Sequence, residues 1–265
     1  MDLVTGHRGF IGSYLYANID AGGIDLKERM DIRTFPWDST EIETLYHLAA
    51  FTSVPESFEL PMDYYDNNVM GTAKITTSDC FDWIVFASSA AVYGSNESKG
   101  IQPESPYALS KVFGEYLINS TGRGTNLRFF NVYGPGQSTM GDYASVIPKF
   151  IVNALSGIDL NIYGDGEQTR DFVHVQDVAK AMISAQGIGG TYEVGSGMEI
   201  SINDLAELII QLCDSDSKIN YYPQRSEEVR NSCADIKPTK KALGWKPEIN
   251  LVKGLKDMIE WTQCL

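Results

Sequence analysis

Short apolar runs without regular polar alternation recur along the first half of this 265-residue chain. Such runs are typical of strands that are covered on both faces, as in a parallel sheet. Helical stretches follow three of them, and two of these helices begin at a proline, which favours a first helical turn. The runs lie at residues 2–5, 22–26, 43–50, 82–89 and 125–134, and the helical stretches at 10–19, 61–75 and 106–118. The alternation predicts an α/β fold built on a doubly wound parallel sheet.

The second half of the chain has a different pattern. Residues 142–157 predict a helix, and residues 160–175 predict a strand, a turn and a strand. Residues 201–214 predict another helix, with Ser201 placed to cap it and apolar residues recurring at the spacing of one helical face. We expect this half to form a smaller C-terminal α/β lobe.

Composition narrows the function classes. The chain carries 21 Lys and Arg against 35 Asp and Glu, a net charge of −14. A surface this acidic repels nucleic acid and anionic lipid, so we expect neither as a partner. No stretch of 18 uninterrupted apolar residues occurs, and the first motif begins too early to leave room for a signal peptide.

The cysteines and histidines give no sign of a metal site. The four cysteines are scattered, without a C-x-x-C pair, and no two histidines stand at ligand spacing. Free thiols fit a reducing compartment, so we predict a cytoplasmic protein without a bound metal.

A glycine-rich loop joins the first predicted strand to the first helix. In "VTGHRGFIG", Gly6 permits a sharp turn, Gly9 lets a diphosphate approach the backbone, and Gly12 allows the helix to pack on the strand. Phe10 and Ile11 open the helix, whose N-terminus favours an anion. The loop predicts a Rossmann-like dinucleotide site.

Acidic residues after the second strand are candidates for the rest of that site. Asp25 stands where an acid holds the ribose hydroxyls, although a plain strand-end turn residue is an equal alternative. The pair Asp31 and Ile32 is placed to meet the adenine. The cofactor is predicted to be NAD, but NADP stays open because a nearby arginine can bind a 2′-phosphate. The basic residues concerned are Arg8, Lys27, Arg29 and Arg33.

Residues 105–111, "SPYALSK", carry the candidate chemistry. Ser105 and Pro106 suit a helix start, which places Tyr107 and Lys111 one turn apart on the same face. A nearby ammonium favours the phenolate and is expected to lower the pKa of the tyrosine, making it a proton donor and acceptor for an alcohol or ketone. Ser89 ends a predicted strand, where it could bind the same oxygen.

These motifs occur in one order along nearly the whole chain. Together with "HLAA" (47–50), "YYDNNVMGT" (64–72), "FASSAAVYG" (86–94) and "RFFNVYGPGQ" (128–137), they resemble the extended short-chain dehydrogenase/reductases, the nucleotide-sugar epimerases and dehydratases. The resemblance implies an NAD-binding Rossmann domain at residues 1–133 plus about 174–190. It implies a nucleotide-sugar-binding lobe at residues 134–173 and 191–265.

The resemblance also implies roles for individual residues. Tyr107 would be the catalytic acid/base, Lys111 its partner and a ligand of the nicotinamide ribose, and Ser89 the hydrogen-bonding hydroxyl. The Ala49–Ala50 backbone and Asn67 would line the cofactor. The residues that would hold a UDP-sugar substrate are Asn131, Arg170, Arg225 and Glu228. A homodimer is the implied assembly.

The positions after the serine separate members of the family. In the family that the chain resembles, dehydratases and decarboxylases carry acidic residues at or near these positions. This chain has Ala90 and Ala91 there, so no side chain at these positions can take or give a proton. The pattern resembles the 4-epimerases that interconvert UDP-glucose and UDP-galactose. Relative to the family that it resembles, the chain is abridged between Gly12 and His47, between Thr72 and Ile84, and between Gly94 and Ser105.

Ser232 falls at the position that forms the pocket wall in the family. In this respect the chain resembles members that accept N-acetylated sugars, which have a small residue at this position. The alternative is that Ser232 is a surface residue outside the pocket. Two other functions stay open: an NADPH-dependent reductase of 4-keto nucleotide sugars, which uses the same Ser-Tyr-Lys set, and a non-catalytic dinucleotide-binding regulator.

Overall fold

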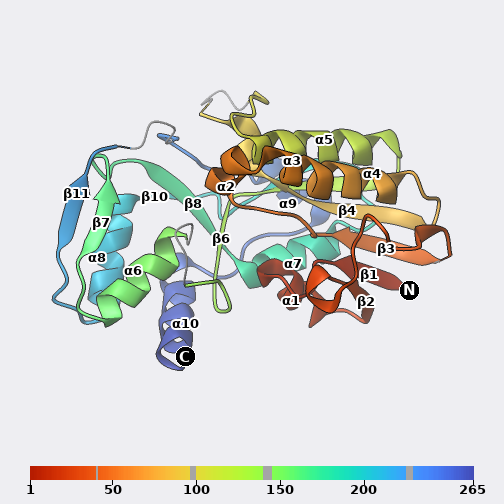
Figure 1. Ribbon diagram of the computed structural model, residues 1–265. Helices are drawn as coiled ribbons and strands as arrows, with labels where there is room; N and C mark the ends of the chain where they lie inside the picture. The colour runs from red at the N-terminus through yellow and green to blue at the C-terminus, as the bar shows by residue number, and fades with distance from the viewer. Residues whose placement is uncertain (40, 96–99, 140–144, 225–228) are drawn as a thin grey trace. The chain divides into compact units, whose positions relative to one another are not determined.

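The computed structural model describes residues 1–39, 41–95, 100–139, 145–224 and 229–265 (Figure 1). The chain divides into two compact units. The first contains residues 1–129, 175–194 and 235–246, and the second contains residues 130–174, 195–234 and 247–265.

A six-stranded parallel sheet forms the centre of the first unit, in the order β2-β1-β3-β4-β5-β9. Its strands are β1 (Asp2–Thr5), β2 (Ala21–Ile24), β3 (Ile42–His47), β4 (Phe81–Ser89), β5 (Gly124–Phe129) and β9 (Gly190–Val194). The reversal of order beside β1 is that of a doubly wound sheet. The predicted α/β fold is therefore confirmed, and the carboxyl ends of the strands share one edge.

Helices cover both faces of this sheet (Figure 1). The helices on one side are α1 (Phe10–Tyr16) and α7 (Val175–Ser184); those on the other include α2 (Val54–Glu59), α3 (Pro61–Tyr64), the π-helical η3 (Tyr65–Met70), α4 (Gly71–Thr76) and α5 (Pro106–Ser120). Short 3₁₀ turns are η1 (Leu26–Glu28), η2 (Trp37–Ser39) and η4 (Ala90–Tyr93). Burial of apolar strand and helix residues stabilises the unit, at roughly 1.5–3 kcal/mol for each fully buried large side chain.

The predicted caps and boundaries around α5 are confirmed. Ser105 precedes the helix in an extended conformation, and its Oγ accepts a hydrogen bond from the Ala108 amide at 3.1 Å. Pro106 occupies the first turn, where no amide donor is needed. Two adjacent residues therefore determine the start of the helix that carries Tyr107 and Lys111.

Residues 235–246 pack with the first unit, whereas the sequence analysis placed them in the C-terminal lobe. Within this segment α9 (Lys237–Leu243) lies beside β9, and Thr239 Oγ1 donates to the Glu193 carbonyl at 2.6 Å. Trp245 is buried and its Nε1 donates to the Asp177 carbonyl at 2.9 Å. These contacts account for the different boundary.

The described residues of the second unit form two small sheets and three helices. One sheet has the order β10-β8-β6 and the other pairs β11 with β7. The elements are β6 (Asn131–Tyr133), α6 (Val146–Leu155), β7 (Leu160–Tyr163), β8 (Thr169–His174), β10 (Glu199–Ser201), α8 (Ile202–Leu212), β11 (Ile219–Tyr222) and α10 (Leu251–Gln263). Their apolar faces share one core, and Ser201 caps α8 as predicted, accepting from the Asp204 amide.

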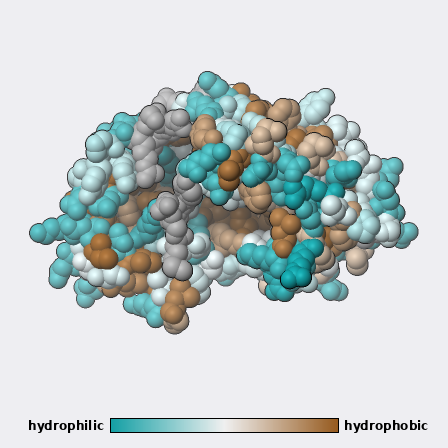
Figure 2. All heavy atoms as spheres, in the orientation of Figure 1, coloured by the Kyte–Doolittle hydropathy of each residue, from teal (hydrophilic) through white to brown (hydrophobic). Residues whose placement is uncertain are grey.

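The exposed surface is largely hydrophilic on one face of the molecule (Figure 2). On the face drawn in Figure 2, hydrophilic residues dominate and apolar residues occur in small separate groups. Across the described residues, no helix is both long and apolar enough to cross a membrane.

Candidate active site

The two central side chains of the candidate site lie on the buried face of α5. Tyr107 and Lys111 are one turn apart and are 8% and 4% exposed. The Lys111 Nζ lies 5.8 Å from the centre of the Tyr107 ring. The helix thus brings the predicted phenol and ammonium together, out of bulk water.

Lys111 is held by the backbone of the neighbouring strand. Its Nζ donates to the Ala87 carbonyl of β4 at 2.7 Å and lies 5.0 Å from the centre of the Phe86 ring. Burial lowers the pKa of Lys111 to about 8, although the negative charge of Glu115 opposes this shift. The ammonium is therefore the dominant form at neutral pH, but it can lose its proton in mildly alkaline solution.

The pKa of Tyr107 differs from the expectation. Burial raises the pKa of this phenol above its ordinary value, and a hydrogen bond with Ser89 lowers it only in part. The expected lowering of the Tyr107 pKa by Lys111 is wrong, since burial disfavours the charged phenolate and outweighs the hydrogen bond from Ser89. Ser89, at the end of β4, nevertheless does lie beside the phenol, and its Oγ accepts from the Ala91 amide at 3.1 Å.

A buried polar network behind this pair escaped the sequence analysis. Glu115, four residues after Lys111, accepts from Ser88 Oγ at 2.5 Å and from two guanidinium nitrogens of Arg128, at 2.8 and 2.6 Å. Arg128 also donates to the Tyr93 hydroxyl at 2.9 Å, which in turn donates to Glu193. The i+4 spacing from Lys111 was the available signal, because it places a carboxylate on the same buried face.

The glycine loop has the geometry that a dinucleotide diphosphate requires. Gly6 has a φ of +74°, and a Cβ there would lie 2.8 Å from the Ala49 amide nitrogen. A Cβ on Gly12 would overlap the Gly6 carbonyl. The loop closes through a 2.9 Å hydrogen bond from the Gly9 amide to the Gly6 carbonyl, and Gly9 precedes α1. Side chains are thus excluded where a diphosphate would approach the backbone.

Asp25 follows β2 and is almost fully buried at 8% exposure. Its two carboxylate oxygens accept from the amides of Arg8 and Lys27, both at 2.9 Å. A carboxylate offers about four acceptor positions, so capacity remains for the two hydroxyls of a ribose. Asp25 lies beside the glycine loop, which agrees with its predicted ribose role and equally with its capping of η1.

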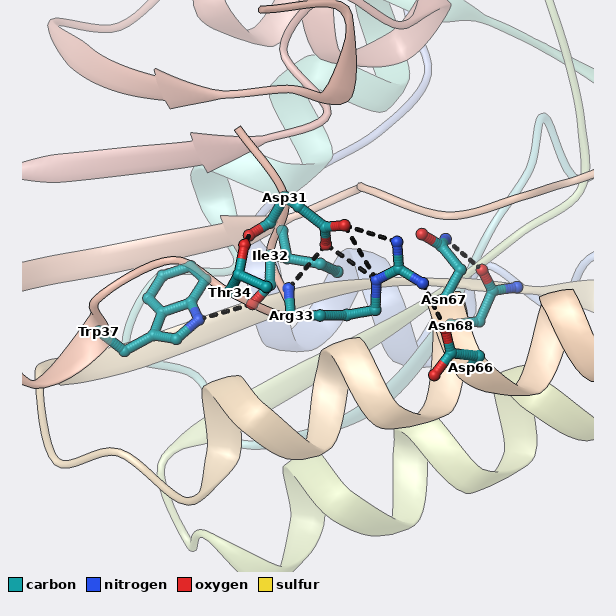
Figure 3. Close-up of polar contacts among 8 residues, drawn as sticks. All are labelled: Asp31, Ile32, Arg33, Thr34, Trp37, Asp66, Asn67 and Asn68. Carbon is teal, nitrogen blue, oxygen red and sulfur yellow. Dashed lines mark hydrogen bonds and ion pairs between the residues drawn. The ribbon is translucent and has the colours of Figure 1, made fainter. Parts of the chain in front are cut away.

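An ion-pair cluster organises the segment predicted to meet the adenine (Figure 3). Arg33 binds the Asp31 carboxylate through its amide at 2.8 Å and its guanidinium at 2.5–3.0 Å, and it also pairs with Asp66 of η3. The arginine holds the pKa of Asp31 below its ordinary value. Ile32 is buried and its carbonyl accepts from Trp37 Nε1 at 2.8 Å.

A second hydrogen-bond chain fixes the Ala49–Ala50 segment. His47 Nδ1 lies 2.7 Å from Thr5 Oγ1, and that hydroxyl oxygen accepts from the Ala49 amide at 3.2 Å. His47 Nε2 lies 2.9 Å from Thr72 Oγ1, which donates to the Asn68 carbonyl. Thr72 can only accept from the ring, so Nε2 carries the proton and Nδ1 accepts from Thr5. Burial lowers the pKa of His47 to about 3, which keeps the ring neutral.

Asn67 and Asn68 join this series of hydrogen bonds to α5. Asn67 donates to Asn68 Oδ1 at 2.9 Å, and both side chains are buried (Figure 3). Asn68 binds both the amide and the carbonyl of Phe51 and donates to Ser110 Oγ of α5. Asn67 was predicted to line the cofactor; Asn68 was missed, and its contacts explain why the sequence has two adjacent asparagines.

Of the predicted substrate residues, Ser89 ends β4 in the first unit, and Asn131, Arg170 and Ser232 belong to the second unit. Asn131 begins β6 and donates to the Asp171 carbonyl at 3.0 Å. Arg170, on β8, donates to the carbonyls of Thr169 and Val229, both at 2.7 Å. Ser232 is half-buried in an irregular segment. The other two, Arg225 and Glu228, lie outside the described residues.

The described residues contain no cluster of three or more histidine, cysteine or acidic side chains that could hold a metal ion. Cys80, Cys213, Cys233 and Cys264 are free thiols. The predicted catalytic groups that the first unit brings together are Ser89, Tyr107 and Lys111.

Comparison with known proteins agrees with this chemistry. A sequence model of the NAD dependent epimerase/dehydratase family matches residues 3–195. A putative UDP-glucose 4-epimerase of Methanocaldococcus jannaschii is 36% identical over 98% of each chain. Relatives of similar identity are also named as a decarboxylase and as dehydratases.

Solved structures give the same picture. The UDP-N-acetylglucosamine 4-epimerase of Methanobrevibacter ruminantium, in complex with UDP-N-acetylmuramic acid, superposes with a TM-score of 0.93 at 32% identity, covering 100% of this chain and 99% of that one. The UDP-glucose 4-epimerase of Thermus thermophilus, in complex with NAD, has a TM-score of 0.86 at 27% identity and covers 98% of each chain.

We predict that the buried ammonium makes stability depend on pH. The pKa of Lys111 is about 8 in the folded chain and ~10.4 when unfolded, so the unfolded state binds more protons between these values and stability rises with pH there. Between pH ~8 and ~9.5 this contribution to the free energy of unfolding should reach about 1–2 kcal/mol.

Urea unfolding of wild type and Lys111→Met across this pH range tests the prediction. The methionine variant should lose the rise, and Lys218→Met, which changes a lysine of the second unit, should keep it. Identical pH dependence in wild type and Lys111→Met would show that Lys111 does not titrate in this range.

Proposed function

The chain belongs to the NAD-dependent epimerase/dehydratase family, and we propose that it is a nucleotide-sugar 4-epimerase that interconverts UDP-glucose and UDP-galactose. The family membership makes it an NAD-dependent enzyme of nucleotide-sugar modification. The observation that supports the finer proposal is an intact set of Ser89, Tyr107 and Lys111 in which Ser89 is directly followed by two side chains without proton chemistry, Ala90 and Ala91.

Epimerisation at C4 requires little beyond this set. In its phenolate form Tyr107 would take the proton of the 4-hydroxyl as a hydride leaves C4, and it would return the proton as the hydride is given back to the other face of the 4-keto sugar. Ser89 donates a hydrogen bond to the same oxygen. A dehydratase or a decarboxylase needs further acid/base groups, and positions 90 and 91 supply none.

NAD, when bound, supplies the hydride acceptor and donor for C4. The residues that would hold it are Gly6, Gly9, Phe10, Ile11 and Gly12 at the diphosphate, Asp25 at the adenine ribose, Asp31 and Ile32 at the adenine, and Ala49, Ala50, Asn67 and Lys111 toward the nicotinamide. Net redox is zero in this reaction, so cofactor is not consumed.

The acidic chain needs local positive charge to bind a UDP-sugar. Asn131 is proposed to meet the phosphates of the sugar nucleotide, and Arg170, Arg225 and Glu228 to hold its diphosphate and its ribose. Charge-assisted bonds from two arginines are strong enough to bind a dianion despite a net charge of −14.

The alternative function is reduction of a 4-keto nucleotide sugar with NADPH. Arg8, whose amide contacts Asp25, is the specific observation in its favour, because an arginine there can bind a 2′-phosphate. Stoichiometric oxidation of NADPH at each turnover would establish the reductase. A non-catalytic role is disfavoured by the retention of both Tyr107 and Lys111.

A homodimer is the proposed assembly. The helix α5 and the helical segment packed beside it carry large exposed apolar side chains, Phe113 and Tyr116 on α5 and Met62 and Met70 on α3 and η3. Covering them would remove apolar surface from water. Light scattering should give twice the 29.3 kDa mass of the chain, and a monomer at micromolar concentration would reject the dimer.

Replacement of the proposed acid/base should abolish most turnover. Tyr107→Phe removes only the hydroxyl, so the rate of UDP-glucose epimerisation should fall ~10²–10⁴-fold while the fold and NAD binding persist. Tyr192→Phe is the matched control, because its hydroxyl donates to the Gly189 carbonyl near the start of β9, away from Ser89 and Lys111. Near-wild-type turnover by Tyr107→Phe would end the proposed mechanism.

The sugar specificity is proposed to depend on Ser232. Its small side chain leaves room for an acetamido group, so UDP-N-acetylglucosamine should be epimerised at least comparably to UDP-glucose. Ser232→Tyr should lower the ratio of kcat/KM for the N-acetylated sugar by ~10–200-fold, since overfilling a pocket costs ~1–3 kcal/mol. Ser232→Ala should preserve the ratio. An unchanged ratio in the tyrosine variant would place Ser232 outside the pocket.

A further inference from the structure

A cluster of oppositely charged side chains surrounds the carboxyl end of β2. It contains Asp25 and Glu28 as acids and His7, Arg8 and Lys27 as potential cations. None of these cationic groups is left without a contact: Lys27 Nζ donates to the Arg8 carbonyl at 2.9 Å, and His7 Nε2 lies 3.3 Å from Glu28 Oε2. The cluster therefore connects the glycine loop to the turn after β2.

The backbone of Arg8 lies next to the position that an adenine ribose takes in this fold. Its amide lies 2.9 Å from the Asp25 carboxylate, and an acid at the end of the second strand binds ribose hydroxyls. An arginine in this place can instead form charge-assisted bonds to a 2′-phosphate. By backbone position alone, Arg8 would favour NADP.

The side chain of Arg8 is engaged by Glu28. The Arg8 Nε lies 2.7 Å from Glu28 Oε1, and a terminal guanidinium nitrogen lies 2.5 Å from the same oxygen. The Glu28 amide donates to the Asp25 carbonyl at 3.0 Å, which fixes the turn that carries the carboxylate. Two carboxylates thus stand on the same short turn beside the ribose position.

We propose that Glu28 determines the preference for NAD over NADP, by neutralising Arg8 and by placing a second carboxylate beside the ribose 2′ position. Glu28 is 33% exposed and Arg8 58%, and ion pairs this exposed contribute little to stability. Loss of the pair should therefore change the stability of the fold little. Its effect is on which dinucleotide binds, because the 2′-phosphate of NADP would meet two carboxylates and an arginine whose charge is already neutralised. The inference rests on the proposed binding of a nicotinamide dinucleotide.

The test is a competition for the cofactor site that does not involve turnover. Purified protein is equilibrated with equal concentrations of NAD⁺ and NADP⁺ until the bound ratio is constant, freed of unbound nucleotide and denatured, and the released nucleotides are quantified by mass spectrometry. Wild type should release mainly NAD⁺. Glu28→Gln should raise the ratio of NADP⁺ to NAD⁺ about 10-fold or more, the scale of one released charge-assisted bond.

Two further variants make the result specific. In Arg8→Ala/Glu28→Gln the gain should be largely lost, because the freed guanidinium is what binds the phosphate. Asp79→Asn is the matched control: it frees Arg123 from a 3.0 Å ion pair just before β4, at the opposite ends of the strands, and should leave the ratio unchanged.

Three outcomes would overturn the proposal: a Glu28→Gln ratio equal to that of wild type, an equal gain in the double variant, or wild type that already prefers NADP⁺. A failure of the proposed epimerase activity is seen separately, in the UDP-glucose assay. A changed nucleotide ratio in a protein without that activity would still support the role of Glu28.

Discussion

The buried ammonium of Lys111 is the constraint on which the candidate site depends. It lies almost fully buried on α5 and donates a hydrogen bond to the Ala87 carbonyl of β4. The helix approaches the strand closely because Gly114 has no side chain, and a Cβ there would overlap the Phe86 ring. Burial of this charge lowers the pKa of Lys111 and opposes stability at neutral pH. This loss of stability occurs where the ammonium lies close to the Tyr107 phenol.

Two polar networks keep this arrangement in place. Glu115, on the same buried face of α5 as Lys111, and Arg128 tie the helix to β4, β5 and the turn after Ser89. On the other side, Asn68 joins α5 to the segment after His47. The groups are buried and paired, so loss of one partner would leave another unsatisfied in the interior. The catalytic and cofactor halves of the first unit are therefore parts of one bonded framework.

Local signals in the sequence predicted the parts of the molecule that are decided locally. Ser105 with Pro106 predicted the start of α5, and the glycine spacing predicted the loop before α1, because caps and tight turns depend on a few adjacent residues. The return of Trp245 to the first unit was not predictable, since its partner lies 68 residues away. The pKa of Tyr107 was also missed, because it depends on burial that only the folded chain creates.

The most direct measurement of the central claim follows the hydrogen at C4. UDP-glucose that carries deuterium at C4 is incubated in ordinary water with the purified protein and no added nicotinamide nucleotide, and the product is analysed by mass spectrometry and NMR. Transient oxidation at C4, with Tyr107 moving only the hydroxyl proton, predicts UDP-galactose that retains the deuterium at C4. Loss of the label to solvent, or product only with stoichiometric NADPH, would contradict the account.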